Sequence, residues 1–435
     1  MRMQSTNALF RRATLSSSTL SIVRRSTLTT ARGFSSTSTT NLPASLRTPT
    51  RTQPSQTIQQ LPTVTPSTTR TMASSSACGS SPSSSPTLEK IPNTSIRILR
   101  TVSSVHRFRR PLTLDSRSVA LVPTMGALHA GHLSLIRAAA RDNHHVMVSI
   151  YVNPAQFGVR EDLGSYPVTW DADCAALAAL DRELADDGEN LGRISAVFAP
   201  TTGEMYPAGF PGQEVDSKGS FVTITPVGEV LEGSSRPTFF RGVATVCMKL
   251  FNVCQPDRVY FGQKDVQQTV VIKRLVEDFL MPIEQVVVVP TERDPEGDGL
   301  ALSSRNVYLG SRRRKVANVL YRALKAAEGA YNAGGEEGTR EREGILGAAR
   351  KVVEETLKEQ MKMEPGRRVR FEVDYLSLAD PETMLELETV DTKKGGILSG
   401  AVRFLPVEEP GEGEDLGHSG GPLVRLIDNI ILPPK

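Results

Sequence analysis

Acidic residues and lysine are absent from the first 88 positions of this 435-residue chain. The same segment holds nine arginines and is dominated by serine and threonine. It has too little apolar content to form a core, so it is excluded from the predicted fold. Because the whole chain carries +3, the remaining residues carry 3 − 9 = −6. The basic average therefore belongs to the N-terminal segment, and the folded part is not expected to bind nucleic acid.

Cysteine and long apolar runs are also scarce. The four cysteines form no CxxC pair, so neither a zinc site nor a disulfide framework is indicated. They fit the reduced thiols of a cytosolic or matrix protein. Cys247 and Cys254 are seven positions apart in an apolar segment and are predicted to lie in a core. No apolar run approaches the ~20 residues that span a bilayer, so no membrane partner is expected.

An arginine-rich, serine-rich N-terminus without acidic residues is typical of a mitochondrial transit peptide. Residues 1–25 could form a basic amphipathic helix, and the string RGFS at 32–35 resembles a matrix-protease cleavage site. The alternative is an extension that carries no targeting signal. Met72 offers a second start that would give a cytoplasmic form. We therefore expect a disordered extension over residues 1–90 and a protein of the mitochondrial matrix or the cytoplasm.

The clearest local pattern lies between residues 118 and 141. The apolar run SVALVPT predicts a buried strand, and helical periodicity follows a turn that carries Gly126 and Gly131. The turn matches neither GxGxxG nor GxxxxGK[ST]. A strand, a turn and a helix start nevertheless offer free backbone N–H groups and a helix dipole to a phosphate. His129 and His132 are three apart and lie on one side of the helix. The pattern predicts a nucleotide triphosphate site.

Strands and helices alternate from residue 118 to 290, which predicts a doubly wound parallel sheet of at most about seven strands. Residues 101–118 look like a largely polar connection. The predicted helices include 170–187 and 266–279. The predicted strands are 118–124, 145–152, 196–200, 221–226, 258–262 and 284–290.

The pattern changes from residue 311 onward and predicts a smaller α+β domain. The run RRRK at 312–315 is interpreted as a solvated helix face, and the acidic, glycine-rich segment 407–421 as a loop insertion. Two charged helices are expected at 311–333 and 341–362, and strands at 369–378, 400–405 and 423–432. The predicted domains are the extension 1–90, a Rossmann-like domain 91–291 and a C-terminal α+β lid domain 292–435.

Polar residues follow several predicted strands, where open parallel sheets bind ligands. Gln156 lies just past the strand that ends near residue 152. Lys264, after the strand 258–262, is a compact cation for phosphate oxygens. Asp265 could hold a hydroxyl group or a water bound to Mg²⁺, and Gln268 lies one helical turn after Lys264. Arg236 and Arg241 are secondary candidates that could hold a carboxylate or lie on the surface.

Four ordered motifs, PTMGALHAGH, VNPAQF, FGQKDVQQ and LALSSRN, resemble the pantothenate synthetase (pantoate–β-alanine ligase) family. His129-Ala130-Gly131-His132 also matches the HxGH signature of the nucleotidyl-transferase superfamily. The resemblance covers about residues 95–432 and departs by extra loop residues near 181–193, 295–298 and 407–421. It implies condensation of pantoate with β-alanine through a pantoyl adenylate, giving pantothenate, AMP and pyrophosphate. ATP, Mg²⁺ held by its phosphates and a homodimer are implied as well.

The family's residue roles carry over onto the matching positions. His132 is the expected catalytic proton donor or electrostatic stabiliser, and Gln156 and Gln268 are expected to position pantoate. Glu292 would meet adenine through its backbone, and the Ser303–Arg305 stretch forms a mobile phosphate clamp. The residues expected to contact ATP are Met125, Gly126, Ala127, Leu128, His129, Ala130, Gly131, His132, Gly262, Gln263, Lys264, Asp265, Glu292, Leu302, Ser303, Ser304 and Arg305.

Two other functions stay open at this point. The chain could be another HxGH adenylyltransferase, whose product would retain the adenylyl group. It could also be a non-catalytic member that binds nucleotide and regulates a partner, although the intact His132, Lys264 and Arg305 count against that. A tRNA synthetase is not favoured, because no sizeable anticodon-binding domain follows residue 310.

Overall fold

The computed structural model describes residues 89–435 apart from 160, 296 and 335–337. The described residues belong to one compact unit, 82–435. The expected transit peptide, its cleavage site, Cys78 and Met72 lie outside the described residues.

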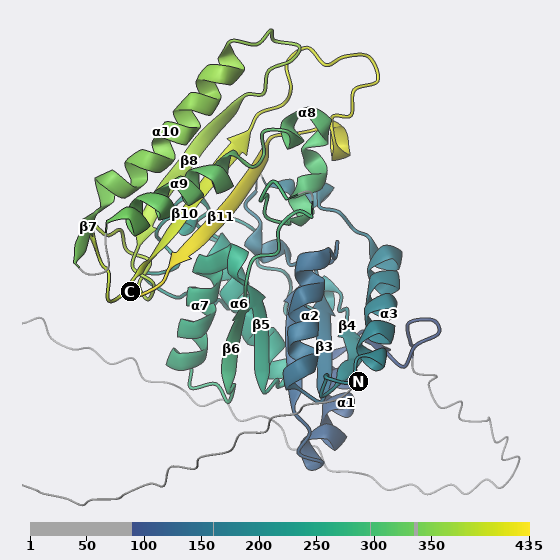
Figure 1. Cartoon of the computed structure of the whole chain (residues 1–435). Coiled ribbons are helices and arrows are strands. Elements are labelled where there is room, and N and C mark those ends of the chain that lie inside the picture. The colour runs from purple at the N-terminus through teal and green to yellow at the C-terminus, as the bar shows by residue number, and fades with distance from the viewer. Residues whose placement is uncertain (1–88, 160, 296, 335–337) are drawn as a thin grey trace, which may run out of the picture. The chain divides into compact units, whose positions relative to one another are not determined.

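Six parallel strands form the first sheet, in the order β1-β4-β3-β2-β5-β6 (Figure 1). This confirms the predicted Rossmann-like, doubly wound sheet. The strand β2 is apolar at successive positions because both faces of the sheet are covered. The strands are β1 (Arg97–Leu99), β2 (Val119–Thr124), β3 (His145–Ile150), β4 (Arg193–Phe198), β5 (Arg258–Gly262) and β6 (Gln285–Val289).

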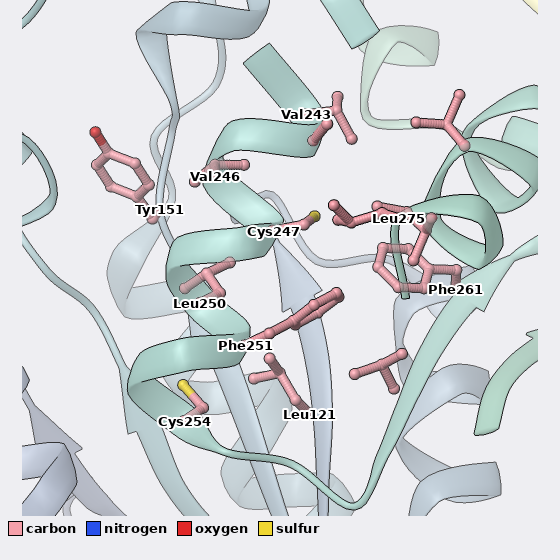
Figure 2. Close-up of a cluster of buried hydrophobic side chains, with 14 of the residues drawn as sticks. Leu121, Tyr151, Val243, Val246, Cys247, Leu250, Phe251, Cys254, Phe261 and Leu275 are labelled. Atoms are coloured by element: carbon pink, nitrogen blue, oxygen red, sulfur yellow. The ribbon is translucent and has the colours of Figure 1, made fainter. Parts of the chain in front are cut away.

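Helices cover the two faces of this sheet with separate apolar cores. On one face pack α1 (Val102–Leu114), α6 (Phe239–Cys254) and α7 (Val266–Asp278). On the other face pack α2 (Ala130–Asp142) and α3 (Trp170–Asp186). Figure 2 shows Cys247 and Cys254 on α6 within the first core, near Leu121 and Phe261. The prediction that both cysteines lie in a core is therefore confirmed.

Two sequence predictions in this region are wrong. The expected polar connection at 101–118 is the helix α1, which Thr101 caps and which buries Val105 and Phe108. The helical spacing of its apolar residues is hard to recognise in the sequence, because arginines and Pro111 lie between them. The expected strand 221–226 belongs to no sheet. It is an irregular segment that packs against α6. There the N–H of Val222 donates to the Thr245 hydroxyl at 2.9 Å.

The remaining elements build a C-terminal α+β region with its own core of residues from 300 to 432. Its antiparallel sheet has the order β11-β10-β8, as Figure 1 shows beside α9 and α10. The strands are β8 (Phe371–Ala379), β10 (Gly396–Phe404) and β11 (Val424–Leu432), with a small pair of β7 (Thr339–Glu341) and β9 (Thr389–Asp391). The helices are α8 (Gly310–Arg314), α9 (Val319–Ala333) and α10 (Arg342–Met361).

Short helices complete the described chain. The helix α4 spans Thr202–Met205 and α5 spans Glu232–Ser235. The 3₁₀ turns are η1 (Pro154–Gln156), η2 (Asp162–Ser165), η3 (Gln263–Asp265), η4 (Ser304–Tyr308) and η5 (His418–Gly420).

The basic run at 312–315 is not a solvated face, which corrects the sequence interpretation. Arg313 is 1% exposed and donates to the carbonyl oxygens of Leu309 and Pro422 at 2.9 and 2.7 Å. Arg312 forms a 2.5 Å ion pair with Glu414. A local pattern cannot reveal this, because the Pro422 carbonyl and the Glu414 carboxylate lie about a hundred positions away. The run therefore fastens the 407–421 insertion to α8.

Replacing Arg313 by Met is expected to lower the free energy of unfolding by about 3 kcal/mol, because buried carbonyl oxygens lose their donors. Chemical denaturation monitored by circular dichroism measures this. The matched control is Arg274→Met on α7, whose side chain is 44% exposed, where a change within about 0.5 kcal/mol is expected. Equal losses in the two variants would show that Arg313 contributes nothing special.

Candidate functional site

The sheet order places a ligand site at the carboxyl end of β2. This strand pairs with β3 on one side and with β5 on the other, so the winding direction reverses there. Open α/β sheets bind ligands in the crevice outside such a reversal. The loops after β2 and β5 open onto a cavity of about 1170 Å³, which the segment 300–306 and the start of β11 also line.

Most of the predicted site residues line this one cavity. Gly126, Ala127, Leu128, Ala130 and Gln263 belong to the same loops but are not part of its wall. Residues from all four motifs are thus brought together, and Glu292 joins them. The lining includes Met125, His129, Gly131, His132, Gln156, Gly262, Lys264, Asp265, Gln268, Glu292, Leu302, Ser303, Ser304 and Arg305.

The turn after β2 differs from the expectation of free backbone donors. The N–H groups of Ala127 and Leu128 donate to the Asp173 carboxylate at 3.1 and 2.8 Å. The N–H of Gly126 faces the Thr124 hydroxyl at 3.3 Å. Gly126 adopts φ +85°, and a Cβ there would also meet Asp173 at 3.0 Å. The turn is therefore held by a protein carboxylate and a protein hydroxyl, and these three N–H groups are not free for a phosphate.

Asp173 is a site residue that sequence reasoning missed. It lies in the first turn of α3, is 2% exposed and also accepts a hydrogen bond from the Thr169 hydroxyl at 3.1 Å. A carboxylate at a helix start is stabilised by the helix dipole. Nothing in the sequence links it to a turn 45 positions earlier.

The two histidines lie in contact, with ring centroids 4.1 Å apart. The N–H of Gly131 donates to Nδ1 of His129 at 3.1 Å, and the N–H of His129 faces Nδ1 of His132 at 3.4 Å. A neutral imidazole whose Nδ1 accepts carries its proton on Nε2. Gly131 permits this arrangement, because a Cβ there would meet the His129 ring at 2.9 Å. Each ring is thus left with an Nε2–H donor.

Burial and positive charge keep both rings neutral. Burial, with the Lys264 ammonium second, lowers the pKa of His129 from 6.5 to about 4. Burial, followed by His129 and Lys264, lowers the pKa of His132 from 6.5 to about 3. Near neutral pH the pair therefore acts through hydrogen-bond donation, without a positive charge of its own.

Lys264 enters the cavity from η3, after β5. Its Nζ lies 3.1 Å from an oxygen of Asp265, whose side chain is 37% exposed. Gln268, one turn further on α7, lines the cavity too. Its side-chain amide has no hydrogen bond to any other described residue, so it is free to meet a substrate.

Arg305 is held across the cavity by Asp162 of η2. Its Nε donates to one carboxylate oxygen at 3.0 Å and its NH2 group to the other at 2.9 Å. The hydroxyl of Ser304 donates to the Ala127 carbonyl at 3.1 Å, which joins this loop to the turn after β2. The predicted phosphate clamp therefore already closes over the histidine-bearing turn.

Gln156 is 9% exposed and lies on η1 at the cavity wall. Its Oε1 accepts a hydrogen bond from Asn153 at 3.1 Å, and its Nε2 lies 3.1 Å from the Met125 sulfur. Arg236, a secondary candidate, lines the cavity but is paired with Glu161 at 2.5 Å.

Arg241, the other secondary candidate, is engaged elsewhere. It donates to the carbonyl oxygens of Val215 and Glu214 at 2.7 and 2.8 Å and stacks on the Phe221 ring at 4.3 Å. Within residues 89–435, gaps excepted, no group of three or more His, Cys, Asp or Glu side chains is placed to hold a metal ion. No helix among the described residues is long and apolar enough to cross a membrane.

The chain is similar to proteins of one family over the whole described part. Residues 97–431 match the family model described as pantoate-beta-alanine ligase. The pantothenate synthetase of Roseiflexus castenholzii is 42% identical over 334 residues, which cover 77% of this chain and 99% of that protein. That of Acidobacterium capsulatum is 46% identical over 320 residues, which cover 74% and 88%.

Solved structures agree with these sequence relatives. The crystal structure of pantothenate synthetase from Thermus thermophilus is 37% identical, with a TM-score of 0.60 over 78% of this chain and 100% of its own. The pantoate-beta-alanine ligase of Francisella tularensis, complexed with beta-gamma ATP and beta-alanine, is 28% identical. Its TM-score is 0.52, over 77% and 97% of the two chains.

The neutral histidine pair predicts a pH dependence of stability. Because both folded pKa values lie below 6.5, the unfolded chain binds protons that the folded chain does not, from about pH 6.5 down to about pH 4 for His129 and about pH 3 for His132. The free energy of unfolding should therefore fall as the pH is lowered through this window. His132→Asn removes one of the two groups, so its fall should be shallower. Denaturant titrations at stepped pH compare the two slopes, and equal slopes would contradict the assignment.

Proposed function

The chain belongs to the pantoate-beta-alanine ligase family, and on that premise we propose how its cavity performs the reaction. The enzyme condenses pantoate with β-alanine, and ATP is converted to AMP and pyrophosphate. The observation that carries the assignment of residues is that all four motifs meet at one cavity. The Francisella tularensis relative, complexed with an ATP species and β-alanine, supports one cavity that takes both ligands.

In the first step the pantoate carboxylate attacks the α-phosphorus of ATP. A bond from the carboxylate oxygen to phosphorus forms, and the bond from phosphorus to the pyrophosphate oxygen breaks. Negative charge shifts onto the phosphate oxygens, so fixed donors and cations lower the barrier. His129, His132 and Lys264 line the cavity, and their Nε2–H groups and ammonium would serve as these donors and this cation. His132 is the proposed catalytic residue, and it acts as a neutral donor because its pKa is lowered to about 3.

The loop 302–305 supplies the second side of the phosphate site. Asp162 uses the Nε and NH2 edge of Arg305, and NH1 has no hydrogen bond to another described residue. Arg305 can therefore bind a phosphate oxygen through NH1 while it stays paired with Asp162. The Ser303 hydroxyl accepts the Arg305 N–H at 3.3 Å, so its own proton is available to a phosphate oxygen. The Ser304 hydroxyl would add a second donor only by releasing the Ala127 carbonyl.

Pantoate has a carboxylate, two hydroxyls and two methyl groups. Gln156 and Gln268 offer amide donors and acceptors that suit the hydroxyls and the carboxylate. Val243, Val246 and Leu250 of α6 give the cavity an apolar wall that suits the methyl groups. In the second step the β-alanine amine attacks the acyl carbon of the adenylate, the C–N bond forms and AMP leaves.

The adenine and the metal complete the proposed site. The Glu292 carbonyl accepts the Leu302 N–H at 3.0 Å, so contact with adenine would use the Glu292 N–H or the second lone pair of this carbonyl. The part-exposed Asp265 carboxylate beside Lys264 offers the oxygen ligand that a Mg²⁺ on the phosphates would need. Bound there, Mg²⁺ would neutralise phosphate charge. The division into a Rossmann-like domain 91–291 and a lid domain 292–435 is part of this proposal.

A homodimer also remains a proposal, since only the family resemblance suggests it. The mass of the full chain in solution, from light scattering, decides between one chain and two.

The first test of the proposed function is AMP release by the purified chain with ATP and Mg²⁺. Pantoate and β-alanine are supplied singly and together, and AMP is expected only with both. His132→Ala should slow the reaction roughly 10²–10⁴-fold, because a phosphate donor is lost. His106→Ala, an exposed histidine on α1, is the matched control and should leave the rate unchanged.

Other outcomes have defined meanings. Pyrophosphate release with a different acid and none with pantoate would keep the adenylation chemistry and reject pantoate as substrate. A product that retains the adenylyl group would indicate another HxGH adenylyltransferase. An unaltered rate in His132→Ala would reject its catalytic role.

The family match begins at residue 97, so residues 1–90 need a separate explanation. We propose that they direct the chain to the mitochondrial matrix, and that a start at Met72 gives a cytoplasmic form. Import by isolated mitochondria is expected for residues 1–90 fused to a fluorescent protein. A fusion that starts at Met72 is the matched control and should stay outside. Equal exclusion of both fusions would reject the targeting role.

A further inference from the structure

Two adjacent polar residues in β11 are buried, although the proposed reaction does not use them. Asp428 is 5% exposed and Asn429 is 1% exposed. Burying polar groups is unfavourable unless they are hydrogen-bonded, so their partners show what they hold. Successive side chains of a strand point to opposite faces. The side chains of Asp428 and Asn429 therefore lie on opposite faces of the C-terminal sheet.

Asn429 binds the backbone on both sides of the Lys264 Cα atom. Its Nδ2 donates to the carbonyl oxygens of Gln263 and Lys264 at 2.8 and 2.9 Å. Its Oδ1 accepts a hydrogen bond from the Gln263 side chain at 3.3 Å. These two carbonyls belong to the peptide groups before and after the Lys264 Cα atom. Fixing both peptide planes fixes the direction in which the Lys264 side chain leaves the backbone.

Asp428 holds the other nucleotide loop, which follows β6. Arg293 donates to its two carboxylate oxygens at 2.7 and 3.2 Å, the bidentate arrangement that best fixes a guanidinium. The Arg293 guanidinium also donates to the Gly299 carbonyl at 2.8 Å and stacks on the Tyr321 ring of α9 at 4.2 Å. Arg293 directly follows Glu292, the residue proposed to meet adenine.

We propose that Asp428 and Asn429 form a brace on β11 that sets the affinity for ATP by positioning the loops that hold it. Both are positioning residues: Asn429 acts through Lys264, and Asp428 acts through the Glu292–Arg293 backbone. The inference rests on the proposed roles of Lys264 and Glu292. The brace brings a strand near the end of the chain against loops 165 and 135 positions earlier.

The test is Asn429→Ala in the full-length chain. Two buried carbonyls then lose their donor, and KM for ATP is expected to rise about tenfold. KM for pantoate and for β-alanine should change less than about twofold, because those contacts remain. The matched control is Gln360→Ala, a buried amide of α10 that accepts the Val369 N–H at 2.8 Å. It should lower thermal stability and leave KM for ATP unchanged.

A double-mutant cycle with Lys264→Ala separates positioning from general destabilisation. If Asn429 acts through Lys264, Lys264→Ala/Asn429→Ala should bind ATP no more weakly than Lys264→Ala alone in calorimetric titration. Additive losses would overturn the brace. If Lys264→Ala binds ATP more weakly than the unaltered chain and Asn429→Ala binds it equally well, the brace is overturned and the proposed function is kept. No loss in Lys264→Ala would overturn both.

Asn429→Ser provides the second variant if Asn429→Ala does not fold. Serine retains one donor, so KM for ATP should rise by less than in the alanine variant and still exceed the Gln360→Ala value. A KM for ATP equal to that of the unaltered chain, in a folded Asn429→Ser protein, would overturn the proposal.

Discussion

A buried carboxylate holding two backbone N–H groups is the constraint on which the active site depends. Asp173 fixes the turn after β2 through Ala127 and Leu128. That turn delivers His129 and His132 to the cavity, and its Ala127 carbonyl receives the Ser304 hydroxyl. Because the N–H groups of Ala127 and Leu128 are bonded within the protein, the turn adopts its conformation without ATP. The site is thus preorganised before any phosphate arrives, which is the condition for efficient electrostatic stabilisation.

The proposed phosphate site combines neutral hydrogen-bond donors with permanently charged cations. The two imidazoles are neutral, since burial and Lys264 lower their pKa values. Among the residues expected to contact ATP, Lys264 and Arg305 carry permanent positive charge, and each lies beside a carboxylate. Without ligand the cations are therefore already compensated. Under the proposed roles, an incoming triphosphate would meet donors that are fixed in place and cations whose carboxylate partners keep them oriented.

Local sequence patterns were sufficient for the parallel sheet, most of its helices and the gathering of motif loops at one cavity. Apolar runs such as 258–262 and the HxGH turn carry their signal within a few residues. Local sequence patterns did not predict α1, because Pro111 and several arginines interrupt the apolar spacing of Val105 and Phe108. Arg313 was misjudged because its carbonyl partners come from remote segments. Asp173, Asp428 and Asn429 gave no signal at all, since their partners lie 45 to 166 positions away. Which lining residues touch substrate remains a prediction.

The distance of β11 from its partners along the chain has a consequence for the order of folding. The parallel sheet is built from strands and helices between residues 97 and 289, whereas β11 bonds loops that lie 135 to 166 positions earlier. Contacts between segments so far apart in the sequence form only after a long loop has been closed, and such contacts slow folding. The motif loops can therefore come together before β11 holds them, and this strand completes the candidate site late in folding.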